Sequence, residues 1–129
     1  MNLTKKGVWK NFSLYVRLRD SDQRGYCSCI SCGTIKHYKE CQAGHFIHNK
    51  NIIFFDEDNV HAQCVRCNQY LHGNLYYYGK TLEQKIGKSA INRLLTLKNK
   101  HHRFNQTELK LINEYCKEEI RKYKKEKLI

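Results

Sequence analysis

Apolar residues near the N-terminus recur at spacings of three and four positions, which places them on one face of a helix. The residues of this stripe are Val8, Phe12, Tyr15 and Val16. We predict an amphipathic helix over residues 5–19 that ends before Gly25.

The clearest helical pattern lies near the C-terminal end of the sequence. Its apolar stripe consists of Leu109, Ile112, Cys116, Ile120 and Tyr123. Asn105 and Glu108 have the spacing of a capping box, in which each side chain bonds the backbone N–H of the other residue. The opposite face is strongly basic toward Lys127. Two further helices are expected over residues 75–86 and 88–97.

The middle of the chain has a shorter period and is interrupted by Gly33 and Gly44. This pattern predicts a knuckle turn followed by a hairpin that carries His45. A short helix is expected to begin near Cys64 and to stop near Gly73. Proline is absent and no repeat or low-complexity run occurs, so residues 1–129 are expected to form one domain.

The chain is strongly basic: 24 Lys and Arg against 12 acidic residues give a formal charge of +12. This charge favours a polyanionic partner, with nucleic acid the leading candidate, although charge alone fits a basic soluble protein equally well. No segment has the roughly 18 apolar residues needed to span a bilayer, and the N-terminus is too polar for a secretory signal. We therefore expect a cytoplasmic protein without a membrane partner.

Two Cys-x-x-Cys pairs, Cys29 with Cys32 and Cys64 with Cys67, have the spacing of a structural zinc site with four thiolate ligands. Cys27 is an alternative ligand, but the spacing favours Cys29. The alternative to zinc is a set of buried free thiols. A zinc ion with four cysteine ligands has no open position for water, so any chemistry must use other residues.

Three polar residues lie between the cysteine pairs or directly after them: His45, Asn59 and Asn68. Hydrolysis of a phosphodiester needs a base that deprotonates water and a cation that binds the scissile phosphate. His45, with an unperturbed pKa near neutrality, fits the general base, and a structural histidine is the alternative. Asn59 would orient His45 or the hairpin. Asn68 could offer its amide oxygen to Mg²⁺ or Mn²⁺.

This order of residues resembles that of the HNH nucleases, also called ββα-metal or His-Me finger nucleases. Their zinc-stapled branch, which includes the junction-resolving endonuclease VII class, has a Cys pair, a base histidine, an asparagine, and a second Cys pair followed by Asn or His. The chain is more closely similar, over nearly its whole length, to the NinG (Rap) recombination nucleases of lambdoid phages. The matching segments are Arg17-Leu18-Arg19-Asp20, Cys29-Ile30-Ser31-Cys32-Gly33-Thr34, Ala43-Gly44-His45, Asn59-Val60-His61, Gln63-Cys64-Val65-Arg66-Cys67-Asn68-Gln69 and Gly73-Asn74-Leu75.

The resemblance implies a metal-dependent endonuclease that cuts branched DNA, such as Holliday junctions and displacement loops, during phage recombination. It also implies a phage or prophage gene expressed in the host cytoplasm. The sequence departs from many HNH sites at Gly44, where Asp or His commonly serves as a metal ligand. We expect His61 to complete the cation shell, with His48 and His72 as the next candidates.

Basic and aromatic residues suggest where DNA would bind. Arg66 lies inside the second knuckle and is the first candidate for a phosphate contact, followed by Arg17 and Arg19. The run Tyr76–Tyr78 could stack on unpaired bases, although helix core and rim is the favoured interpretation. A homodimer is expected because a four-way junction offers two equivalent strands.

The sequence thus predicts an α+β fold, with a zinc-stapled ββα-metal core over about residues 27–74 and helical flanks over about 5–19 and 75–127. The predicted function is that of an endodeoxyribonuclease with structural Zn²⁺ and catalytic Mg²⁺ or Mn²⁺. One alternative is a non-catalytic, zinc-dependent DNA-binding module. The other is an HNH nuclease of the nicking or restriction type.

Overall fold

The computed structural model describes residues 2–48 and 52–129, and within them it shows a mixed α+β fold, as the sequence predicts. Two two-stranded antiparallel sheets lie between the first and the second helix in the chain order. The helices are α1 (Lys5–Arg19), α2 (Leu75–Leu97) and α3 (Gln106–Glu126). The strands are β1 (Tyr26–Ser28), β2 (Ile35–His37), β3 (Cys41–His45) and β4 (Val60–Cys64). Two short helical turns are η1 (Tyr38–Glu40) and η2 (Arg66–Tyr70).

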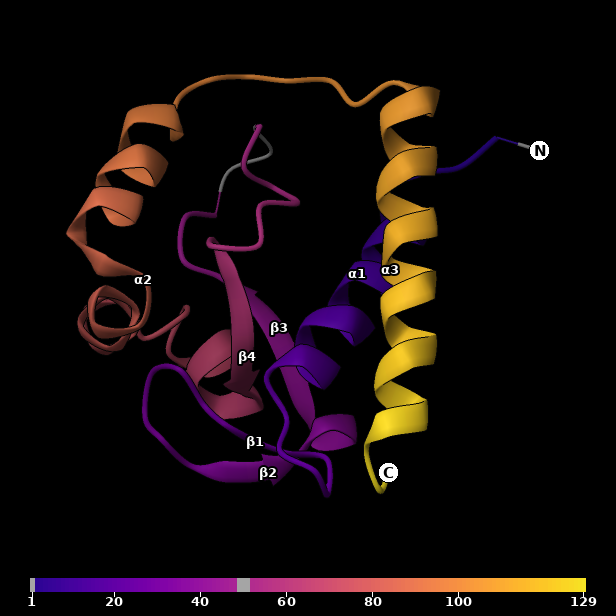
Figure 1. The fold of residues 1–129 in the computed structure, drawn as a ribbon. Coiled ribbons are helices and arrows are strands. Elements are labelled where there is room, and N and C mark those ends of the chain that lie inside the picture. Colours follow the sequence, from indigo (N-terminus) through magenta and orange to yellow (C-terminus); the bar gives the residue numbers. More distant parts are fainter. Residues whose placement is uncertain (1, 49–51) are drawn as a thin grey trace.

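The β3–β4 hairpin lies in the middle of the molecule (Figure 1). Helices α1 and α3 pack together on one side of it, and α2 lies on the other side. A long connection, residues 98–105, crosses from α2 to α3 (Figure 1). None of the helices in the described residues is long and apolar enough to cross a bilayer.

Helix α1 has the bounds that its apolar stripe predicts. Thr4 caps its N-terminus by accepting a hydrogen bond from the backbone N–H of Gly7. The buried face of α1 packs with α3 and with the near face of the hairpin in one apolar cluster. The buried members of this cluster are Val8, Phe12, Tyr15, Val16, Ala43, Phe55, Val60, Leu109 and Cys116. Burial of this face anchors the hairpin against the two helices.

The last residues of α1 cover the outer edge of β4. Arg19 donates from Nη2 to the carbonyl of Val60 at 2.8 Å, and the Asp20 carboxylate accepts the N–H of Ala62 at 2.8 Å. The N–H of Ile30 bonds the carbonyl of Ala62 at 3.0 Å. These bonds satisfy backbone groups that an unpaired strand edge would otherwise leave open.

Helices α2 and α3 follow the predicted pattern closely. Residues 75–97 form two helical arms that break at Gly87, where the backbone has φ 86° and ψ 163°. This break is the boundary expected between the helices over 75–86 and 88–97, because a positive φ suits glycine. The capping box at the start of α3 is present: Asn105 Oδ1 accepts from Glu108 N, and Glu108 Oε1 accepts from Asn105 N.

The central region differs in detail from the prediction. Two hairpins are present, and the unpredicted one, β1–β2, carries the first cysteine pair in its turn. Its strands have three residues each and are mostly exposed, so their sequence has no clear alternation of apolar and polar positions. The predicted hairpin is β3–β4, with His45 at the end of β3. The expected short helix begins after Cys64, which is the last residue of β4, and its η2 turn ends at Tyr70.

Candidate metal and catalytic site

The four predicted cysteines come together. The Sγ atoms of Cys29, Cys32, Cys64 and Cys67 all lie within 4.8 Å of one another, and those of Cys32 and Cys64 are 3.7 Å apart. A tetrahedral zinc ion with Zn–S bonds of about 2.3 Å separates its sulfur ligands by roughly 3.8 Å. The described residues therefore fit a structural zinc site, formed by the β1–β2 turn and the junction of β4 with η2.

Polar groups around the cysteines also suit thiolate ligands. The N–H of Cys67 points to Cys64 Sγ at 3.4 Å, and Asn74 Nδ2 donates to Cys67 Sγ at 3.5 Å. Burial raises the pKa of the Cys67 thiol to about 12, so a bound cation is needed to hold that thiolate at neutral pH. Cys27 lies outside the cluster and bonds the carbonyl of Arg17, so the structure groups Cys29, and not Cys27, with the other three cysteines.

His45 ends strand β3 on the face that meets α1. Its ring stacks on Trp9, with centroids 4.7 Å apart and planes inclined by 17°. Its Nε2 lies 2.9 Å from the carbonyl oxygen of Phe54. A carbonyl can only accept, so the proton of the neutral ring is on Nε2 and the lone pair is on Nδ1. This is a tautomer that can accept a proton from water.

The pKa of His45 is lowered to about 4, mainly because the ring is largely removed from water. The Phe54 carbonyl opposes this shift, whereas the nearby charges of His48 and Lys5 add to it. The expected pKa near neutrality is therefore not found. In the free protein His45 is neutral at pH 7, with its lone pair available.

Asn59 is fully buried and holds the loop between β3 and β4. Its side chain accepts from the N–H of Ile47 at 2.9 Å and donates to the carbonyls of Ile47 and Ile53 at 3.0 and 3.2 Å. Its own carbonyl accepts the N–H of Phe46 at 2.8 Å. Of the two roles predicted for Asn59, these bonds correspond to orienting the hairpin.

Asn68 lies on η2 with its amide facing β3. Its Nδ2 donates to Gln42 Oε1 at 2.8 Å, so its Oδ1 is directed elsewhere. A Cβ placed on Gly44 would lie 2.9 Å from that oxygen and 2.6 Å from Gln63 Cδ. The space of the missing side chain at position 44 is thus occupied by two amides, from Asn68 and Gln63.

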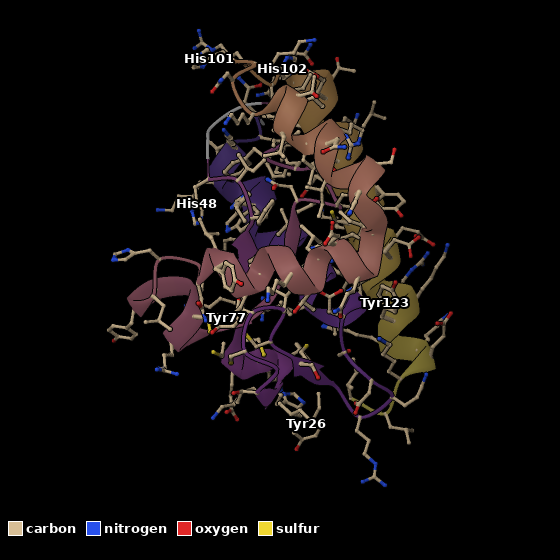
Figure 2. The ribbon with its side chains drawn as sticks, turned by 90° about the vertical axis from the view of Figure 1, so that its left-hand side faces the viewer. Tyr26, His48, Tyr77, His101, His102 and Tyr123 are labelled. Atoms are coloured by element: carbon tan, nitrogen blue, oxygen red, sulfur yellow. The ribbon has the colours of Figure 1, made fainter. Side chains whose placement is uncertain are left out.

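The histidines proposed as cation ligands lie in different surroundings. His61 pairs with Gly44 across the hairpin and is buried, and its Nδ1 lies 3.3 Å from the hydroxyl of Tyr78. That hydroxyl donates to the carbonyl of Gly44 at 2.8 Å, so it accepts from His61. Burial lowers the pKa of His61 to about 3. His72 is exposed in a left-handed conformation, φ 50°, and His48 projects from the surface (Figure 2).

A groove of about 370 Å³ runs between α1 and η2 along β3. Its walls come from Trp9, Ser13 and Arg17 on one side and from Asn68 and Gln69 on the other, with residues 41–43 as its floor. Trp9, which stacks on His45, and Asn68 therefore border the same groove.

The three predicted DNA-contacting arginines are not equivalent. Arg17 borders the groove while donating to the carbonyls of Ser13 and Tyr38. Arg19 is engaged inside the protein by Asp20 and by backbone carbonyls at the β4 edge. Arg66 is exposed and borders a second groove beside the zinc site. Arg17 and Arg66 therefore have the better access to a phosphate.

The tyrosine run divides as its core-and-rim interpretation predicts. Tyr78 is fully buried, whereas Tyr76 and Tyr77 are 67% and 55% exposed. Figure 2 shows Tyr77 at the surface of α2. The exposed rings remain candidates for base stacking.

Sequence reasoning overlooked Gln63 and Trp9. The strand pattern offered one signal for Gln63. Residues 61 and 63 lie on one face of β4, and this is the face on which a side chain at position 44 of β3 would lie. Trp9 had no comparable signal, because its importance comes from contact with a residue far along the chain.

The fold and the cysteine cluster define a small α+β protein with four cysteines that could hold a structural metal ion. The chain belongs to the NinG family: the family model described as "Bacteriophage Lambda NinG protein" matches residues 4–126. It is 38% identical over 100 residues to "Protein ninG" of Salmonella phage P22, which covers 76% of this chain and 46% of the relative. It is 37% identical over 89 residues to "Protein ninG" of Escherichia phage lambda, covering 67% of this chain and 41% of the relative. The chain thus aligns with less than half the length of these relatives. No solved structure was found to match.

Proposed function

We propose that this protein is a metal-dependent DNA endonuclease of the HNH type. The observation that carries the proposal is the state of His45: a neutral imidazole with its lone pair on Nδ1, stacked on Trp9 beside a groove that Asn68 also borders. The β3–β4 hairpin followed by η2 supports a ββα-metal core, and the zinc site would hold the two ends of that core together.

Each site residue has a role in this proposal. His45 accepts the proton of the attacking water at Nδ1, and a phosphate bound in the groove would raise the depressed pKa of the resulting imidazolium. Asn59 fixes the loop that carries Phe54, so the tautomer of His45 is maintained. Asn68 would hold Mg²⁺ or Mn²⁺ through Oδ1. When bound, that cation stabilises negative charge on the scissile phosphate and the leaving oxygen.

Binding to DNA would rest on charge and shape. The formal charge of +12, with Arg17 at the groove and Arg66 beside the zinc site, favours contact with phosphates. Similarity to the NinG (Rap) nucleases of lambdoid phages suggests branched DNA as the substrate, met in the host cytoplasm during recombination. A homodimer would suit the two equivalent strands of a four-way junction.

The test is cleavage of an end-labelled four-way junction and of a linear duplex of the same sequence, with zinc-loaded protein and Mg²⁺ or Mn²⁺. His45→Ala should abolish cutting while leaving junction affinity unchanged, and His101→Ala, at an exposed position, should cut like the wild type. Equal cutting of both DNAs would favour a nicking or restriction-type nuclease.

The second candidate, a DNA-binding zinc module without catalysis, is favoured by Gly44, which offers no ligand where many HNH sites have one. Binding of the junction by the wild type without cutting, under any divalent cation tested, would establish it in place of the nuclease.

A further inference from the structure

Gln63 has an unusual environment for a buried polar side chain. It is fully buried in β4, and its Oε1 is the one buried side-chain polar atom without a hydrogen-bond partner in the part of the chain that the structure describes. Leaving such an oxygen unpaired costs about 1–3 kcal/mol. A buried orphan of this kind points to a bound water or ion.

The orientation of the Gln63 amide is fixed by its other end. Nε2 donates to the carbonyl of Gly73 at 2.7 Å and to Ser31 Oγ at 2.8 Å. Because a carbonyl cannot donate, the nitrogen must lie at Gly73 and the oxygen must face the opposite way, toward Gly44. Gly44 has only Cα–H groups in place of a side chain, and a Cα–H is at most a weak donor.

A second amide oxygen faces the same place. Asn68 uses its Nδ2 to bond Gln42, which leaves Oδ1 at 2.9 Å from the Cβ position of Gly44. Gly44 has no left-handed backbone, so its conformation would accept other residues. A side chain is excluded there because the Gln63 amide occupies its space.

We propose that Gln63 Oε1 and Asn68 Oδ1 together bind a hard divalent cation, with Gln63 replacing the ligand that Gly44 lacks. The inference rests on the proposed function for its biological meaning and extends it by naming the second protein ligand. Amide oxygens suit Mg²⁺ and Mn²⁺, which keep several waters when protein ligands are few. Asn68 is half-buried at the groove and gives the ion access to solvent and to a DNA phosphate.

Two neutral ligands contribute no charge, so affinity for the cation alone should be modest. Oxygen atoms of a DNA phosphate would supply the missing negative charge. The site should therefore bind its cation more tightly once DNA occupies the groove.

The test is a titration of zinc-loaded protein with Mn²⁺ in which EPR measures the bound ion. It needs no measurement of activity. Gln63→Ala and Asn68→Ala should each weaken binding at least about tenfold, since even changes around metal ligands cost that much. Gln23→Ala, at an exposed amide outside the groove, should bind Mn²⁺ like the wild type. The double variant Gly44→Asp with Gln63→Ala should recover binding, because the space freed at Gln63 admits a carboxylate from position 44.

A second measurement avoids any loss of folding in the variants. Titration of the wild type with Mg²⁺ should shift the side-chain amide NMR signals of Gln63 and Asn68 and leave that of Gln23 unmoved. Unchanged Mn²⁺ affinity in folded Gln63→Ala protein, or unmoved Gln63 and Asn68 signals, would overturn the inference. DNA cleavage by a protein that fails these tests would keep the nuclease and reject Gln63 as a ligand. Binding through Gln63 without cleavage would reject the nuclease alone.

Discussion

Substituting Gly44 by alanine should destabilise the protein far more than a surface glycine would. The added Cβ would lie 2.6 Å from Gln63 Cδ and closer still to its oxygen, well inside van der Waals contact. The amide cannot turn aside without losing its bonds to Gly73 and Ser31. Overpacking costs about 1–3 kcal/mol, and a buried polar group left unpaired costs about as much again. We expect a loss of about 3 kcal/mol.

The assay is urea unfolding of zinc-loaded protein, followed by far-UV circular dichroism. For a domain of this size the loss corresponds to a decrease of roughly 12 °C in Tm. In a Gln63→Ala background, Gly44→Ala should cost no more than about 1 kcal/mol, because the Gln63 amide is gone and only Asn68 Oδ1, 2.9 Å from the added Cβ, must shift. A suitable control is Gly79→Ala in α2, where the Cβ would meet Phe46 at 3.3 Å and helix propensity offsets the contact.

Two results would refute this reasoning. One is a Gly44→Ala protein as stable as the wild type. The other is an equal loss of stability in both backgrounds, which would show that Gln63 does not fill the space next to Gly44.

Three further changes should have distinct effects. Cys67→Ser, or removal of zinc by a chelator, should unfold the hairpin core, since structural zinc contributes on the order of 10 kcal/mol; retained near-UV dichroism would contradict the zinc assignment. Asp20→Ala should cost about 3 kcal/mol in urea unfolding, because the half-buried Arg19 loses its carboxylate and the Ala62 N–H loses its acceptor; Asp58→Ala, at an exposed ion pair, should cost less than about 1 kcal/mol. His61 has a folded pKa of about 3, below its unfolded value, so only the unfolded chain binds its proton as the pH falls below 6.5. Relative to His61→Phe, the wild type should therefore lose about 2 kcal/mol between pH 7 and 5, and parallel pH profiles would exclude this linkage.

Parts of the fold governed by local rules could be predicted from the sequence. The stripes of α1 and α3 and the Asn105–Glu108 capping box depend on residues within a few positions of one another, and the structure has all three. The cysteine clamp was also predictable, because the two-residue spacing within each pair already brings its sulfurs to one ion.

The first hairpin and the lining of the site were not predictable in the same way. Strands β1 and β2 are short and mostly exposed, and the turn they support is fixed by the cysteines rather than by an apolar pattern. The low pKa of His45 results from burial of its ring, which stacks on Trp9, and it persists although the bond to the Phe54 carbonyl opposes it. Both contacts result from packing between α1 and the hairpin region. No periodicity in the sequence reports such a contact.

Gly44 shows how a single position can mislead when it is considered alone. In the sequence it is a missing ligand, and histidines nearby in the chain were the natural replacements. In the structure the space is filled by Gln63, which also bonds Ser31 in the first knuckle and Gly73 beyond the second. A zinc ion held by the four cysteines would fix both knuckles, and the bonds to Ser31 and Gly73 would then fix the Gln63 amide. The cysteine cluster and the oxygen that faces Asn68 are therefore connected through one side chain, and a metal held by the four cysteines would contribute to the geometry of the proposed cation site as well as to stability.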